Sequence, residues 1–274
     1  MAVIPLLRNN AMTCTLKVLG CSGGIGAELR TSSFLLNDSI LIDAGTGVGD
    51  LSLDELRKID HVFLTHSHLD HICSIPFLAD AVGGSRDRPL KVFGIYETIH
   101  ALQDYIFNDV IWPNFTKIPS PKKPFISLHL VQIDEPIQID GLTITALPVD
   151  HSIAANGYAV SSDTGALVFS GDTGVSDDFW QAVNQQKNLK HLIIETSFLD
   201  QEEEMAIVSG HLSPSLLIGE IEKLDSKVVA TDFEIWICHL KPDGGEAIMQ
   251  EITALSQNTT LKPQKLSRNT ILYF

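Results

Sequence analysis

A dense group of histidine and aspartate side chains is the most chemically suggestive part of this chain. Residues 65–72 read T-H-S-H-L-D-H-I and directly follow a short apolar run. Imidazole and carboxylate groups are ligands for zinc and related divalent ions, and three imidazoles within six residues can converge from one turn. Packing alone does not explain such a group. We therefore expect His66, His68, Asp70 and His71 to bind metal.

Further candidate ligands occur where other apolar runs end. Asp43 follows S-I-L-I, His151 follows A-L-P-V-D, Asp172 follows L-V-F-S-G, and His239 follows E-I-W-I-C. A turn comes next in each case, and loops of this kind carry ligands and catalytic groups in α/β proteins. An Asp before Gly is, taken alone, more often a turn residue. Together with the first group, these residues supply enough ligands for two metal ions.

The elements that must position these residues alternate along the whole chain. Strands are predicted at 15–19, 34–36, 40–42, 62–64, 91–94, 127–132, 143–148, 158–161, 167–170, 191–194 and 235–238. Helices are predicted at 51–58, 69–81, 97–107, 177–186, 214–224 and 245–256. This alternation favours layered α/β architecture in a single domain over residues 1–274, with 1–12 as a loose tail. Residues 112–125 contain four prolines and are expected to form a loop near the site.

Composition narrows the class of partner. The 274 residues include 19 Lys and Arg against 34 Asp and Glu, for a formal charge of −15. Extended nucleic acid is therefore a poor first expectation, because its phosphates require a basic surface. The four cysteines lack a CxxC pair and are expected to be free thiols. No run is long or apolar enough for a signal peptide or a membrane span, so we expect a cytoplasmic protein.

The T-H-S-H-L-D-H stretch resembles the HxHxDH signature of the metallo-β-lactamase superfamily. Asp43, His151, Asp172 and His239 also occur in the order that this superfamily uses, so the resemblance covers nearly the whole chain. It implies an αββα sandwich, in which two β-sheets pack face to face with helices outside. The metal site would lie at one edge of the sandwich.

The same resemblance implies a role for each ligand. One ion would be held by His66, His68 and His151, a second by Asp70, His71 and His239, and Asp172 would bridge them. Asp43 would orient a ligand through a hydrogen bond, and Asp70 would also be catalytic. A hydroxide between the two ions would be the nucleophile. Zinc is the expected ion, although manganese or iron suits the same ligands.

Flanking residues point to a phosphoester substrate. The longer stretch H-S-H-L-D-H-I-C-S, ending at Ser74, is similar to the signature of class II cyclic-nucleotide phosphodiesterases, and departs from it near Ala79 and Asp80. Residues 193–198 (I-I-E-T-S-F) and 209–214 (S-G-H-L-S-P) resemble segments of phosphodiesterases and tRNA 3′-processing nucleases. By that resemblance, Glu195 holds His211, which contacts the phosphate or protonates the leaving oxygen.

The expected function is therefore hydrolysis of 3′,5′-cyclic AMP or GMP to the 5′-monophosphate. Ser74 and His211 are expected to contact this small-molecule substrate, with Trp112 and Phe115 as walls of a base pocket. The simpler interpretation of the Pro-rich loop is a surface connector. A compact homodimer is compatible with the sequence.

Several alternatives stay open at this point. A tRNA 3′-endonuclease shares all these residues but needs a basic arm, and a glyoxalase II-type thioester hydrolase leaves His211 without a role. Gly20, Gly24 and Gly26 are spaced as in short-chain NAD(P) oxidoreductases, with Asp43 about where a ribose-binding acid falls. That alternative lacks the Tyr and Lys four residues apart and leaves the histidines unused. A binding module that lost its chemistry would lack ligands, and none is missing.

Overall fold

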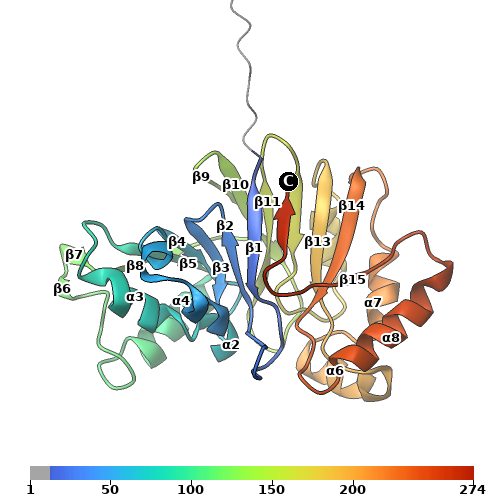
Figure 1. Cartoon of the computed structure of the whole chain (residues 1–274), viewed down its shortest axis with the longest axis horizontal. Coiled ribbons are helices and arrows are strands. Elements are labelled where there is room, and N and C mark those ends of the chain that lie inside the picture. Colours follow the sequence, from blue (N-terminus) through green and yellow to red (C-terminus); the bar gives the residue numbers. More distant parts are fainter. Residues whose placement is uncertain (1–12) are drawn as a thin grey trace, which may run out of the picture.

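Short apolar strands form two seven-stranded sheets that pack face to face in the computed structural model, which describes residues 13–274 (Figure 1). The first sheet runs in the order β16 (Ile271–Tyr273), β1 (Thr15–Gly20), β2 (Ser33–Leu36), β3 (Ile40–Ala44), β4 (His61–Phe63), β5 (Leu90–Gly94) and β8 (Ile126–Leu130). The second runs in the order β15 (Gln264–Lys265), β14 (Val229–Cys238), β13 (Leu189–Glu195), β12 (Ala166–Phe169), β11 (Asn156–Ser161), β10 (Leu142–Pro148) and β9 (Pro136–Ile139). A small hairpin joins β6 (Pro119–Ser120) to β7 (Lys123–Pro124).

Each sheet is antiparallel at one end and parallel at the other. Strands β16, β1, β2 and β3 pair antiparallel, whereas β3, β4, β5 and β8 pair parallel. Likewise, β9 to β12 pair antiparallel and β12 to β15 pair parallel. Parallel strands buried on both faces are apolar throughout, which explains runs such as I-L-I and L-V-F.

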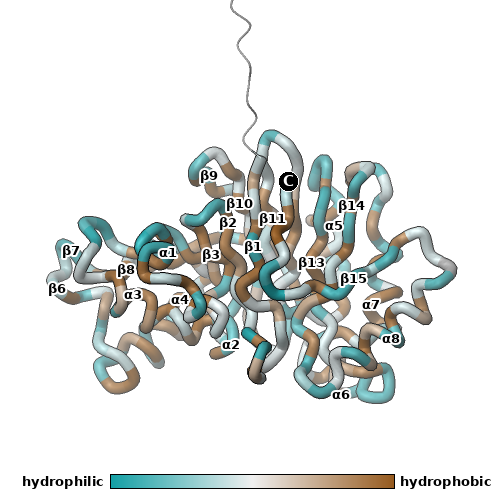
Figure 2. The backbone as a smooth tube through the Cα atoms, in the orientation of Figure 1, coloured by the Kyte–Doolittle hydropathy of each residue, from teal (hydrophilic) through white to brown (hydrophobic). Residues whose placement is uncertain are grey.

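Alternate residues of these strands enter different cores. In β3, Ile40 and Ile42 face the core between the sheets, while Leu41 faces the helices outside. In β12, Leu167 and Phe169 face the same central core, and Val168 faces the other outer core. Figure 2 shows hydrophobic stretches along the central strands and hydrophilic ones in many outer loops. The predicted αββα sandwich is confirmed.

Helices cover the outer face of each sheet. Those beside the first sheet are α1 (Leu53–Leu56), α2 (Leu69–Ile72), α3 (Ile75–Gly83), α4 (Tyr96–Ala101) and the π-helical turn η2 (Leu102–Ile106). Those on the side of the second sheet are α5 (Asp177–Val183), α6 (Glu203–Ser209), α7 (Pro214–Ile221) and α8 (Gly245–Leu255). Elsewhere in the described chain, 3-10 turns are formed by η1 (Thr46–Asp50), η3 (Asp200–Glu202) and η4 (Ser256–Asn258). The prediction of one helix over 69–81 is wrong. Pro76 in the first turn of α3 cannot continue the ladder of a preceding helix, so the chain breaks into α2 and α3.

The strand pairing also shows whether the glycine-rich turn after β1 could bind a dinucleotide. The next strand, β2, pairs antiparallel with β1, and no helix lies between them. A dinucleotide-binding unit requires a parallel strand reached through a helix, so the oxidoreductase interpretation is wrong. Among the described residues, no helix is long and apolar enough to cross a membrane. The predicted loose tail at 1–12 lies outside the described residues, and the single-domain assignment stays a prediction.

Candidate active site

The carboxyl ends of strands from both sheets deliver the predicted ligands to one edge of the sandwich. His66 and His68 follow β4, and α2 carries Asp70 and His71 in a single turn. From the second sheet, three loops follow β10, β12 and β14 and carry His151, Asp172 and His239. Residues far apart in sequence therefore meet where strands of both sheets end.

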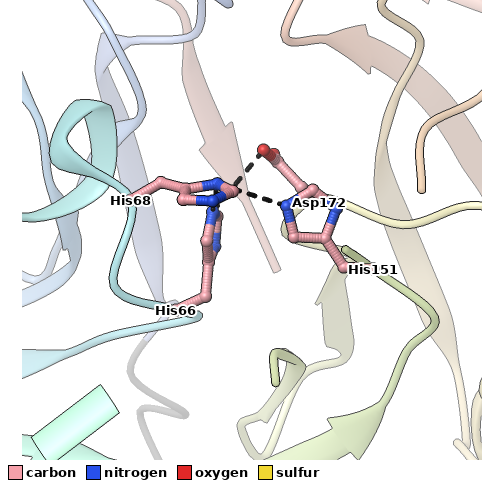
Figure 3. A group of neighbouring side chains, drawn as sticks. All are labelled: His66, His68, His151 and Asp172. Atoms are coloured by element: carbon pink, nitrogen blue, oxygen red, sulfur yellow. Dashed lines mark hydrogen bonds and ion pairs between the residues drawn. The ribbon is translucent and has the colours of Figure 1, made fainter. Parts of the chain in front are cut away.

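The first group of ligands consists of His66, His68, His151 and Asp172, and their donor atoms lie within 4.8 Å of one another (Figure 3). His68 Nδ1 is 3.0 Å from His66 Nε2 and 3.3 Å from His151 Nε2. Asp172 Oδ2 is 3.7 Å from His66 Nε2. The three rings turn these nitrogens toward a common point, as metal ligands do.

A second group shares Asp172 with the first and adds Asp70, His71 and His239. His71 Nε2 is 3.4 Å from Asp172 Oδ2 and 3.6 Å from Asp70 Oδ2. His239 Nε2 is 3.4 Å from the same Asp70 oxygen. Asp172 is the one residue common to both groups, so its carboxylate lies between two adjacent sets of donors.

The donors suit a divalent cation. The Nε2 atoms of His71 and His239 are buried and have no hydrogen-bond partner among the described residues. A buried nitrogen without a partner is unfavourable, and a metal ion would satisfy both atoms. Nitrogen and carboxylate oxygen together match zinc, manganese or iron. The residues present therefore fit a metal centre.

Burial keeps three of the ligand histidines neutral, whereas the Asp172 and Asp43 carboxylates outweigh burial at His71 and raise its pKa well above the usual value. Burial lowers the pKa of His66 well below its usual value, lowers that of His151, and lowers the pKa of His239 to about 4. These rings are therefore neutral at pH 7 and offer lone pairs. Burial acts to raise the pKa of Asp172, but the His239 and His71 imidazoles outweigh it and hold that pKa well below the usual range. The shared carboxylate is thus ionised.

Outer hydrogen bonds fix the orientation of the ligand rings. Asp43, wholly buried, accepts a 2.7 Å hydrogen bond from His71 Nδ1, which turns Nε2 toward the centre. The Thr65 hydroxyl lies 2.8 Å from Asp43 Oδ2 and 3.0 Å from His66 Nδ1, so it can donate to one and accept from the other. His151 Nδ1 lies 2.8 Å from the Gly210 carbonyl oxygen. Partners of this kind set both tautomer and ring direction.

Two of these residues have an unusual backbone. Asp43 has φ of 56° and His239 has φ of 58°, both in the left-handed region that residues with a Cβ rarely adopt. Such strained conformations persist where the surroundings hold them, and they are common at functional sites. Asp43 lies at the irregularity in the β2–β3 pairing, and His239 directly follows the end of β14.

Glu195 and His211 form a pair beside the metal-ligand groups. Glu195 ends β13, is wholly buried, and its Oε1 lies 2.6 Å from His211 Nδ1. Its other oxygen accepts a 2.9 Å hydrogen bond from the Ser197 hydroxyl. The His211 ring centre is 4.9 Å from that of His151 and 5.4 Å from that of His239. Burial would lower the pKa of His211, but the Glu195 carboxylate outweighs it and raises that pKa.

Comparison with known proteins agrees with this architecture. The model of the beta-lactamase superfamily domain matches residues 38–230, which is most of the chain. The chain belongs to the metallo-β-lactamase superfamily. It is therefore an enzyme of the hydrolase class, with a His and Asp cluster able to hold metal.

Relatives within the superfamily have more specific names. A probable 3′,5′-cyclic-nucleotide phosphodiesterase of Yersinia pestis is 26% identical over 251 residues, covering 76% of this chain and 71% of the relative. The 3′,5′-cyclic-nucleotide phosphodiesterase 1 of Saccharomyces cerevisiae is 25% identical over 244 residues, covering 77% and 65%. The ribonuclease Z of Clostridium beijerinckii is 32% identical over 152 residues, covering 52% and 47%. The crystal structure of unliganded yeast PDE1 superposes with a TM-score of 0.78 at 19% identity, covering 96% of this chain and 99% of that one.

One of the expected substrate contacts packs in an outer core, and a second makes a buried hydrogen bond. Phe115 is only 3% exposed and packs in an outer core, with its ring 5.2 Å from that of Phe125. Ser74 is 8% exposed, and its hydroxyl donates a 2.7 Å hydrogen bond to the Gly45 carbonyl. The expectation for Phe115 is corrected, because its loop turns the ring into this core, whereas a substrate contact of Ser74 stays a prediction. Trp112, half-buried, packs against Phe77 and Phe115.

Sequence reasoning missed an aromatic ring and a cation that do lie near the centre. Phe198, at the end of the I-I-E-T-S-F stretch, has its ring centre 5.7 Å from that of His211. Lys241 lies two residues beyond His239, with its Nζ 5.9 Å from the centre of the Phe198 ring. Their positions three residues after Glu195 and two after His239 are the only signal that the sequence offers for them.

Proposed function

We propose that this superfamily member is a phosphodiesterase that hydrolyses 3′,5′-cyclic nucleotides to 5′-monophosphates with two divalent ions bound. The observation that carries the proposal is the Glu195–His211 pair, whose imidazole lies against two ligand rings, those of His151 and His239. A thioester hydrolase would have no need of this pair. The names of the Yersinia and yeast relatives support the same substrate class.

The residues would hold the ions in the two groups described above, with Asp172 shared and Asp70 as both ligand and catalytic carboxylate. When bound, two such ions supply charge stabilisation for the phosphoryl group and make hydroxide available near neutral pH. Zinc is the ion we propose. Asp43 and Thr65 fix the orientation of the His71 and His66 rings before substrate binds.

His211 would act on the leaving oxygen. Glu195 Oε1 accepts a 2.6 Å hydrogen bond from His211 Nδ1. The other ring nitrogen of His211, Nε2, can therefore donate a proton to the substrate. As a hydroxide oxygen bonds to phosphorus and the P–O3′ bond breaks, that proton passes to the 3′ oxygen, which stays on the ribose as its 3′-hydroxyl group. The buried Glu195 carboxylate then holds the ring in the same orientation for the next cycle. The product is the 5′-monophosphate.

An alternative substrate is precursor tRNA, since a ribonuclease Z is among the relatives. A nuclease that grips the acceptor stem needs an extended basic surface, and the chain carries a formal charge of −15. The cyclic nucleotide, a small anion, places no such demand.

We also propose that the protein is a cytoplasmic homodimer. Size-exclusion chromatography with light scattering would check the dimer.

The test is hydrolysis of 3′,5′-cyclic AMP and GMP by the zinc-loaded or manganese-loaded enzyme, with nucleotide products separated by chromatography. We expect 5′-AMP and 5′-GMP, and loss of both with Asp172→Ala, which removes the shared ligand. If bis(p-nitrophenyl) phosphate is cleaved while both cyclic nucleotides survive, the substrate proposal is wrong and precursor tRNA becomes the next substrate to test.

A further inference from the structure

Lys241 has no role in the proposed mechanism, although its backbone is tied to the centre. His239 N donates a 2.7 Å hydrogen bond to the Cys21 carbonyl, and Gly23 N donates a 3.0 Å bond to the Leu240 carbonyl. These bonds pair residues 239–240 with the turn that follows β1. The chain that carries Lys241 is therefore held in place by backbone hydrogen bonds at the ligand histidine and at the residue that follows it.

The glycine-rich turn brings Lys241 close to the ligand ring. A Cβ at Gly23 would lie 2.4 Å from the His239 carbonyl oxygen and 2.9 Å from ring atom Cδ2 of His239. Only glycine permits this approach, which gives the glycine run a structural purpose. The Gly23 carbonyl in turn lies 3.4 Å from Lys241 Nζ. One residue thus contacts both the ligand ring and the ammonium group.

Lys241 also differs from the neighbouring cations in having no acidic partner. Arg30 and Arg268 both pair with Asp50, and Lys265 pairs with Glu246. Among residues 13–274, no carboxylate lies within 4.0 Å of Lys241 Nζ; its neighbours are the Gly23 carbonyl and the Phe198 ring, 5.9 Å away. A half-buried cation over an aromatic face is favourable, and with one proton directed at the Gly23 carbonyl the ammonium group has two more protons to donate to an anion.

We propose that Lys241 binds a non-bridging oxygen of the anionic phosphoester, with Phe198 and the Gly23 carbonyl holding its ammonium group in place. The proposal rests on the proposed function, since it assumes a phosphoester substrate. A phosphodiester carries its negative charge on the non-bridging oxygens, and a cation beside the ligand groups would bind one of these oxygens. Lysine serves as a point charge for phosphate. His211, Phe198 and Lys241 then form one wall of the substrate site.

The decisive variant is Lys241→Met, which keeps the length of the side chain and removes the charge. Binding of 5′-AMP to the zinc-loaded enzyme, measured by titration calorimetry, should weaken by roughly 10- to 100-fold, the loss expected for a hydrogen bond to a charged group. Lys241→Arg should stay within about threefold of wild type, because it keeps the charge. The matched control is Lys265→Met, which removes a neighbouring, already paired cation and should bind 5′-AMP as wild type does.

Kinetics on bis(p-nitrophenyl) phosphate add an independent readout. Lys241→Met should raise KM by a similar factor while kcat changes by less than about threefold, and its KM should depend less on salt than that of wild type. Phe198→Leu should raise KM by a smaller factor, about threefold, because the ring only steers the ammonium. Equal melting temperatures of the variants would exclude general damage.

The outcomes separate this proposal from the proposed function. If cyclic nucleotides are not cleaved but Lys241→Met still weakens 5′-AMP binding, the substrate assignment fails and the role of Lys241 stands. If cyclic nucleotides are cleaved and Lys241→Met binds 5′-AMP as tightly as Lys265→Met, the role of Lys241 is wrong. Failure of the wild-type enzyme to bind 5′-AMP at all would also overturn it.

Discussion

Replacing His211 with alanine removes the proposed proton donor while leaving both ligand groups intact. His211 is 8% exposed and accounts for one ring packed between His151, His239 and Phe198. The substitution should lower the free energy of unfolding by roughly 3–5 kcal/mol, because it leaves the wholly buried Glu195 carboxylate without its imidazole partner. Its main effect should fall on the step in which the leaving oxygen departs, because Nε2 no longer delivers a proton there.

The size of that effect depends on the leaving group. An alkoxide such as the 3′ oxygen of a cyclic nucleotide needs protonation, so kcat should fall by roughly 10²- to 10⁴-fold, the usual range for a positioned general acid. A p-nitrophenolate ion leaves without protonation, so the loss on bis(p-nitrophenyl) phosphate should be below about tenfold. Glu195→Gln keeps a hydrogen-bond partner 2.6 Å from Nδ1 but removes its charge. It should lower kcat on cyclic AMP by roughly tenfold, about 1.4 kcal/mol.

The assay compares kcat on the two substrates for wild type, His211→Ala and Glu195→Gln, at equal zinc content. A large loss on cyclic AMP and a small loss on the nitrophenyl ester would support the role of His211. Equal losses on both substrates would refute the reasoning, since they would mean that His211 binds the phosphate or maintains the centre. Zinc content and melting temperature distinguish the latter two cases.

Three further outcomes are expected from the same structure. Chelation should lower the melting temperature reversibly, because two buried imidazole nitrogens then lack any partner; an unchanged value in scanning calorimetry would mean that no ion binds there. Thr65→Val removes the hydroxyl that contacts Asp43. The free energy of unfolding measured in urea should therefore fall by roughly 1–3 kcal/mol, and zinc affinity measured by competition titration should weaken roughly 10- to 100-fold. Thr65→Ser should restore both values. Away from the site, Arg88 and Arg86 outweigh burial and lower the pKa of Asp60. The ionised Asp60 side chain therefore stabilises the fold above the unfolded-state pKa of about 3.9. This stabilisation disappears as the pH falls through the lower folded-state pKa. Asp60→Asn should therefore be about 1–3 kcal/mol less stable at pH 7, with a smaller gap from wild type at pH 3, as urea titrations at both pH values would measure.

The metal ligands could be predicted from sequence because their signal is local. Histidine and aspartate at turn positions directly after apolar runs indicate ligands without any knowledge of strand order. Glu195 and His211 needed more, because nothing within residues 193–214 says that the two side chains meet. Their contact depends on Glu195 ending β13 and on the left-handed Gly210, which turns the chain after α6 back onto His151.

The positions of Phe198 and Lys241 near the centre could not be predicted, for the same physical reason. Trp112 and Phe115 are in a Pro-rich segment that the sequence marks as a loop, yet their side chains pack with apolar neighbours of the first sheet. Burying an aromatic side chain in a core removes its apolar surface from water, which is more favourable than leaving it exposed at the edge of a site. Phe198 is kept half-buried because its segment crosses the carboxyl ends of the strands, where His211 and Lys241 are its neighbours.

The centre spans the interface between the two sheets, so metal binding and sandwich packing must be coupled. The segment after β4 supplies His66, His68, Asp70 and His71, whereas the second sheet supplies His151, Asp172 and His239. Asp172 Oδ2 approaches His66 and His71 across this interface at 3.7 and 3.4 Å. Apart from these contacts, the faces are held by an apolar core that includes the Phe34–Phe169 ring pair. Because a site shared by both sheets does not exist when they separate, the free energy of ion binding contributes to the stability of the whole sandwich.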